Sequence, residues 1–110
     1  MIRRVSLLTR RPQPSHAECV DHWENVHEPL ALKVPDIRRY GQSHITDEYF
    51  RSDIPPQEDE VDGIAELCYD SMENLERSSG SPEAEALYAD GALIIGKIRT
   101  FIVEEKTIIY

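Results

Sequence analysis

Apolar residues recur at helical spacing after Ser15, and this pattern predicts a helix that runs to Lys33. The residues that share its inner face are Cys19, Trp23, Val26, His27 and Leu30. Ser15 and Glu18 have the spacing of a capping box, in which each side chain accepts an N–H of the first turn. Pro29 lies inside the helix and removes a backbone N–H, so we expect a kink near His27.

Four segments have the composition and length of β-strands: residues 2–9, 37–45, 63–69 and 98–104. The second of them has an unusual alternation, because neither of its faces is plainly hydrophobic. Tyr40, Gln42 and His44 share one face with Arg38. We therefore expect one face of this strand to meet a polar cavity rather than an apolar core.

Two further helical segments and a long loop complete the pattern. Residues 47–62 carry seven acidic side chains and a Pro-Pro pair, which predicts an exposed loop. A solvated connector and a functional lid both fit this loop. Ser71 starts a short helix that breaks at Gly80. Ser81 then caps a second helix with Pro82 at its first position, and we expect this helix to stop near Gly91.

The order of these elements is β-α-β-β-α-β, which predicts an α+β, ferredoxin-like fold in which both helices cover one face of a four-stranded antiparallel sheet. The other face of the sheet has no cover within the chain. The simplest cover is a second copy of the chain, packed sheet against sheet. The apolar end of the chain, Ile108 to Tyr110, supports a homodimer because it needs a partner surface.

Length and charge limit the class of protein. A chain of 110 residues fits a single domain, residues 1–110. The formal net charge of −9 repels nucleic acids and anionic membranes, so we expect neither as a partner. No apolar run approaches the ~20 residues of a membrane span, and the N-terminus lacks a signal-peptide core. Cys19 and Cys68 are predicted to be buried thiols of a cytoplasmic protein rather than a disulfide.

Three stretches of the chain together resemble the EthD-like family of dimeric α+β barrels: HWENVHEPLALKVPDIRRYGQSHI, DGIAELCYDS and RTFIVEEKTII. The most specific part is W-x-x-x-H-x-P-L-A followed by R-R-Y-x-Q. The resemblance implies a homodimer with a cavity under each helix layer. It also implies kinship with cofactor-free methylmuconolactone isomerases and fungal polyketide dehydratases or decarboxylases. The isomerase group has a cysteine directly after the glutamate of its third strand. Here Leu67 takes that place and Cys68 follows it, on the other face of the strand.

Two sets of side chains are candidates for proton transfer. His27 and Trp23 lie one turn apart on the inner helix face, where His27 is either a core histidine or a cavity acid or base. His44, Tyr40 and Gln42 place a titratable ring, a phenol and an amide on one strand face. We predict His27, His44 and Tyr40 as catalytic residues, with Trp23 and Gln42 lining the substrate site.

The third predicted strand carries a lone carboxylate. Glu66 is either paired with Arg38 or Arg39 or acts as a base, and Cys68 shares its face. We include Glu66 and Cys68 among the predicted substrate-binding residues. The other two histidines, at positions 16 and 22, are predicted to lie in solvent.

The sequence contains none of the motifs of metal-dependent, nucleotide-dependent or serine-nucleophile enzymes. There is no HExxH, paired CxxC, phosphate loop, dinucleotide fingerprint or serine elbow, so we expect neither a metal nor another cofactor. What remains is a cofactor-free isomerase or lyase that moves a proton on a small cyclic or aromatic-derived carbonyl or lactone compound. The alternatives are a non-catalytic accessory or ligand-binding protein and a haem-handling barrel.

Overall fold

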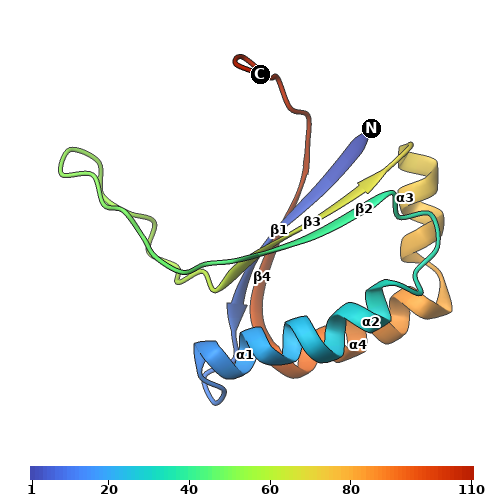
Figure 1. Cartoon of the computed structure of the whole chain (residues 1–110), viewed down its shortest axis with the longest axis horizontal. Coiled ribbons are helices and arrows are strands. Elements are labelled where there is room, and N and C mark those ends of the chain that lie inside the picture. Colours follow the sequence, from blue (N-terminus) through green and yellow to red (C-terminus); the bar gives the residue numbers. More distant parts are fainter.

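The fold is a four-stranded antiparallel sheet with its helices on one side, as the computed structural model of all 110 residues shows (Figure 1). The strands are β1 (Ile2–Arg10), β2 (Arg39–His44), β3 (Gly63–Tyr69) and β4 (Ile95–Val103), in the spatial order β2-β3-β1-β4. The helical elements are α1 (His16–His22), the π-helical turn η1 (Trp23–His27), α2 (Glu28–Ala31), α3 (Met72–Ser79) and α4 (Pro82–Ile94). The predicted ferredoxin-like arrangement is confirmed. No helix has both the length and the apolar character that crossing a membrane requires.

The strand register aligns the side chains that face the helices into rows across the sheet. Three such rows run from β2 through β3 and β1 to β4: Tyr40, Leu67, Arg4 and Ile102; Gln42, Ala65, Ser6 and Thr100; His44, Gly63, Leu8 and Ile98. Successive side chains of a strand point to opposite faces. The residues between these rows therefore lie on the other face of the sheet, which no helix of the chain covers.

The first helix contains a π turn where the kink was predicted. Pro29 has no N–H, and the turn just before it widens, so that the N–H of Glu28 donates to the carbonyl of Trp23 five residues back. This turn changes which residues face inward. Val26, predicted on the inner face, is 48% exposed, whereas Ala31 is 3% exposed and belongs to the core.

Several element boundaries differ from the prediction. Helix α4 continues through Gly91 to Ile94, and β4 starts at Ile95, three residues before the predicted start. Gly91 does not end the helix; it lies inside α4 and faces His27, where a Cβ added to it would lie 3.5 Å from Cε1 of the ring. Strand β2 is shorter than predicted and begins at Arg39.

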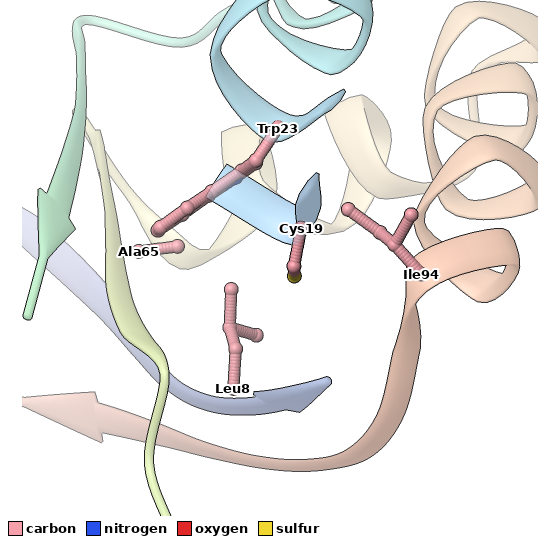
Figure 2. Close-up of a cluster of buried hydrophobic side chains, with 5 residues drawn as sticks. All are labelled: Leu8, Cys19, Trp23, Ala65 and Ile94. Carbon is pink, nitrogen blue, oxygen red and sulfur yellow. The ribbon is translucent and has the colours of Figure 1, made fainter. Parts of the chain in front are cut away.

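The indole of Trp23 belongs to the main core cluster. Its companions are Leu8, Cys19, Ala65 and Ile94, contributed by the sheet and by two helices (Figure 2). Gly63 makes this packing possible, because a Cβ at that position would overlap the indole, with Cη2 at 2.9 Å. Cys19 and Cys68 are both free and buried, as predicted.

The segment between β2 and β3 extends away from the sheet and is largely exposed, as predicted (Figure 1). Its last residue, Asp62, is an exception with a side chain only 5% exposed. This carboxylate accepts hydrogen bonds from the backbone and guanidinium of Arg10, and it lies 2.7 Å from Nδ1 of His16. The His16 side chain is 43% exposed, in line with its predicted place in solvent, but its ring also connects the loop to the start of α1.

Candidate functional site

A cavity of about 180 Å³ lies between the sheet and the helices. Its floor comes from the helix-facing rows of the sheet, including Ser6, Ala65 and Leu67. Its walls include Trp23 and His27 from the first helix. Helix α4 closes another side with Leu87, Tyr88 and Gly91, and Tyr40 reaches the cavity from β2. The cavity is thus mainly apolar, with a few polar side chains that could orient a ligand.

His27 is held in the cavity wall by an acidic residue from α4. Its Nδ1 lies 2.8 Å from Oδ2 of Asp90, and its side chain is 11% exposed. Because a carboxylate only accepts hydrogen bonds, this contact places the proton of a neutral imidazole on Nδ1. Nε2 makes no hydrogen bond within the chain, so its lone pair remains free for a ligand.

Asp90 is shared by two histidines. Its second oxygen, Oδ1, lies 3.0 Å from Nε2 of His22. Burial of Asp90 opposes its ionisation, but the hydrogen bonds from His27 and His22 outweigh this effect and lower the pKa of the carboxyl group. Asp90 is therefore ionised at neutral pH. His22 was predicted to lie in solvent, and this prediction is wrong: its ring is three-quarters covered and bound to Asp90.

Tyr40 is oriented by a chain of hydrogen bonds along β2. The side-chain amide of Gln42 donates to the phenolic oxygen of Tyr40 at 2.9 Å and to the carbonyl of Trp23 at 2.9 Å. Nε2 of His44 lies 2.9 Å from Oε1 of Gln42, so the His44 ring donates there. Burial raises the pKa of Tyr40, partly offset by the Gln42 bond, so the phenol keeps its proton at neutral pH. Its O–H remains available as a donor.

Some of the predicted site residues line the cavity and others do not. Trp23, His27 and Tyr40 line it. Gln42 and His44 lie beside it on the same face of the sheet but do not line it. The Gln42 amide is occupied by Tyr40, and the His44 ring packs against Trp23 with 5.1 Å between ring centroids.

Glu66 and Cys68 lie on the opposite face of the sheet, away from the cavity. The Glu66 carboxylate pairs with Arg3 at 2.6 Å and with Arg39 at 2.7 Å, so the ion-pair interpretation with Arg39 is the one observed. The Arg3 guanidinium is the main cause that lowers the pKa of Glu66. The thiol of Cys68 lies 3.7 Å from the same carboxylate.

Sequence reasoning missed two charged residues of the site. Asp90 lies one turn before the end of α4, between Ala89 and Gly91, and only the approach of the two helices brings it to His27. Arg4 lines the cavity from β1, in a segment interpreted only as an apolar strand. Strand alternation would have placed Arg4 on the same face as Ser6 and Leu8. No group of three or more His, Cys, Asp or Glu side chains is arranged to hold a metal ion.

Comparison with known proteins places this architecture in a family. A family model described as "EthD domain" matches residues 11–97. An EthD-family protein from Bacillus halodurans is 26% identical, with a TM-score of 0.74 over 96% of this chain and 99% of the other. No curated protein matches.

Two more distant structures share the fold alone. A dimeric ferredoxin-like protein of unknown function from Bacteroides fragilis is 12% identical, with a TM-score of 0.68 over 94% of this chain and 95% of its own. A hydroxynitrile lyase from Passiflora edulis is 15% identical, with a TM-score of 0.68 over 96% and 95%. With most of its length matched by the family model, the chain belongs to the EthD family.

Proposed function

We propose that this protein is a cofactor-free isomerase or lyase that moves a proton on a small cyclic or aromatic-derived carbonyl or lactone compound. The observation that carries the proposal is the environment of His27. Its Nδ1 is bound to an ionised carboxylate while its Nε2 is free at an apolar cavity. This is how a neutral imidazole is prepared to act as a base.

Two side chains, His27 and Tyr40, carry out the proposed reaction. Nε2 of His27 takes a proton from a carbon next to the substrate carbonyl, and the electron pair of that C–H bond moves to the carbonyl oxygen. The O–H of Tyr40 donates a hydrogen bond to the oxyanion that develops. The imidazolium, stabilised by Asp90, then returns the proton to another carbon in an isomerisation or to a leaving group in an elimination. No external reactant is required.

Gln42 and His44 act in this proposal as positioning residues. The amide of Gln42 donates to the oxygen of Tyr40, which directs the phenolic proton away from Gln42. His44 fixes the orientation of that amide through its Oε1. His44, predicted as a proton carrier, is thus assigned an indirect role. Trp23 supplies the apolar wall.

The size of the cavity favours a small substrate over a cofactor. Pockets for drug-sized ligands have volumes of about 300–1,000 Å³, and this cavity is smaller. An engineered apolar cavity of about 150 Å³ accommodates benzene, so a single ring with short substituents fits here. A haem macrocycle does not. An accessory, ligand-binding role remains the competing function, because it needs the same cavity without the proton transfer.

We further propose a cytoplasmic homodimer formed through the uncovered face of the sheet. Phe101 is 39% exposed on that face, and Val5 and Leu7 are only half-buried there. Ile108 and Ile109, in the C-terminal tail, are more than 80% exposed. The Bacteroides fragilis neighbour is described as dimeric. Sedimentation analysis should give a dimer at low micromolar concentration, and a folded monomer there would contradict the proposal.

Proton exchange tests the catalytic proposal directly. The protein is incubated in D₂O with muconolactone and related unsaturated lactones, and deuterium entry next to the carbonyl is followed by NMR. His27→Gln should reduce exchange by about 10²–10⁴-fold, the usual effect of losing a general base. Tyr40→Phe should reduce it less, while His16→Gln serves as a matched histidine control. Equal exchange in the parent and His27→Gln proteins, with unchanged melting temperatures, would favour the accessory role.

A further inference from the structure

Arg4 is an unusual arginine in this chain, because it lines the cavity and has no carboxylate partner. The chain has 21 acidic residues against 12 basic ones, and most of its arginines form ion pairs. Those with a carboxylate within 4 Å are Arg3, Arg10, Arg38, Arg39, Arg51 and Arg77. Arg4 faces the helices and the cavity instead.

The hydrogen bonds and the cation–π contact of the Arg4 guanidinium are all made with neutral groups. Its Nη1 donates to Oγ of Ser79 at 3.1 Å, and its Nη2 lies 3.5 Å from the hydroxyl of Tyr88. The guanidinium lies over the ring of Tyr69, 5.7 Å from the centroid. A guanidinium has five N–H donors in a planar fork, so most of them remain unused here. The cation–π contact with Tyr69 helps to hold the guanidinium in place.

Arg4 lies across the cavity from the proposed catalytic groups. Arg4 and Tyr40 belong to the same row of the sheet, with Leu67 between them. Two interstrand spacings separate their backbones by about 10 Å. A small ring can therefore lie over Leu67 with its carbonyl group at Tyr40 and a second polar group at Arg4. That second group must accept hydrogen bonds, because Arg4 only donates.

We propose that Arg4 binds a carboxylate of the substrate, which makes the substrate a small carbonyl or lactone compound that also carries a carboxylic acid. The Tyr88 hydroxyl offers a further donor next to Arg4. The net charge of −9 repels anions from the protein as a whole, so a carboxylate ligand gains its affinity from this local cation. The identification of the carbonyl group rests on the proposed function, whereas the carboxylate site rests on Arg4 itself.

Binding of simple aromatic acids tests the carboxylate site without any turnover. Phenylacetate and benzoate are compared with phenylacetamide and benzamide, which have nearly the same shape and no charge. Dissociation constants are measured by protein-observed NMR with the full chain. A charged hydrogen-bonded contact of about 1.5–3 kcal/mol corresponds to a preference of about 10- to 150-fold for the acid over the amide.

Four variants assign the preference to a residue. Arg4→Gln should bind acid and amide about equally, and Arg4→Lys should keep part of the preference because it keeps the charge. Arg51→Gln, which removes an exposed arginine of the loop before β3, should behave like the parent protein. His27→Gln should keep the preference as well. Melting temperatures and NMR spectra check that each variant is folded, and if Arg4→Gln is unfolded the comparison rests on Arg4→Lys.

The outcomes separate this proposal from the proposed function. Equal affinity for acid and amide in the parent protein, no binding of either acid at millimolar concentration, or a full preference that survives in both Arg4 variants would each overturn the carboxylate site. If the preference depends on Arg4 but His27→Gln leaves proton exchange unchanged, the anion site stands and the catalytic role of His27 fails. If His27→Gln abolishes exchange and the parent shows no preference, the reverse holds.

Discussion

Replacing Asp90 by asparagine tests whether this carboxylate sets the protonation of His27. The ionised carboxylate accepts the Nδ1 proton of His27 at 2.8 Å and contacts His22 with its other oxygen. An asparagine side chain keeps the shape but has one oxygen and one NH₂ group. It can therefore serve only one of the two rings as an acceptor. Where the NH₂ group faces His27, it donates to Nδ1, and the proton of the ring must then lie on Nε2. Nε2 then has no free lone pair with which to act as a base.

The size of the effect follows from the hydrogen bond. His27 and Asp90 are each 11% exposed, so water screens their contact little. Hydrogen bonds to a charged partner are worth about 1.5–3 kcal/mol. At about 1.4 kcal/mol per factor of ten, the carboxylate favours the Nδ1–H tautomer by about 10- to 150-fold. We expect Asp90→Asn to reduce proton exchange by at least about tenfold.

The tautomer can be observed without a substrate. In protein with ¹⁵N-labelled histidine, two-bond ¹⁵N–¹H correlation spectra recorded where the His27 ring is neutral should show a proton on Nδ1 and none on Nε2 in the parent protein. In Asp90→Asn the Nε2–H form should gain population. His22→Gln is the matched control, because it leaves the carboxylate on His27 and should keep the parental tautomer. An Nε2–H tautomer in the parent protein would refute the proposed base.

Three further predictions concern stability and thiol chemistry. Gly63→Ala should lower the free energy of unfolding by about 2 kcal/mol, because the new Cβ overlaps the Trp23 indole. Calorimetry can compare it with Gly91→Ala, for which no loss of stability is expected because the new Cβ would lie 3.5 Å from the nearest side-chain atoms. Burial of Asp62 opposes its ionisation, but hydrogen bonds from Arg10 and His16 lower its pKa overall. The stability that ionised Asp62 adds to the folded protein should therefore be complete above about pH 4 and disappear as the pH falls through the pKa of Asp62 in the folded protein. Denaturant titrations should therefore separate Asp62→Asn from the parent at pH 7 and bring the two curves together in acid, and a gap that persists there would contradict this. Burial raises the pKa of the Cys19 thiol, so iodoacetamide should label it slowly in folded protein and rapidly in urea, and the melting temperature should not depend on reductant.

The sequence was sufficient to predict the order of elements because strands and helix caps are local signals. Ser15 and Ser81 each cap a helix as predicted, the short helix α3 begins next to Ser71, and the third strand has the predicted bounds. The predicted helix ends were wrong where a residue type can serve either as a local signal or as a packing position. The sequence suggests a helix stop at Gly91, but this residue lies inside α4 and packs against His27. Tertiary packing decided that position.

The site was less predictable because it depends on pairs that are distant in the chain. Asp90 and His27 are 63 positions apart, and nothing near either residue indicates the other. From the sequence, Glu66 could be either an ion-pair partner of Arg38 or Arg39 or a base. Its partners come from two neighbouring strands, Arg3 of β1 and Arg39 of β2, and only the strand register reveals them. A polar residue on a strand is therefore informative only once its cross-strand neighbours are known.

The π turn links the sequence pattern to the geometry of the site. The buried residues of the first helix, Cys19, Trp23, His27 and Ala31, are spaced four apart. In an α-helix each step of four overshoots a full turn by about 40°, so three steps would rotate Ala31 about 120° away from Cys19. The wider turn η1 takes back part of this rotation and keeps all four on the inner face. Pro29 favours the irregularity, because it has no N–H to offer an α-helical bond. The same turn leaves the carbonyl of Trp23 accessible to Gln42, and thereby connects the wall that carries His27 to the strand that carries Tyr40.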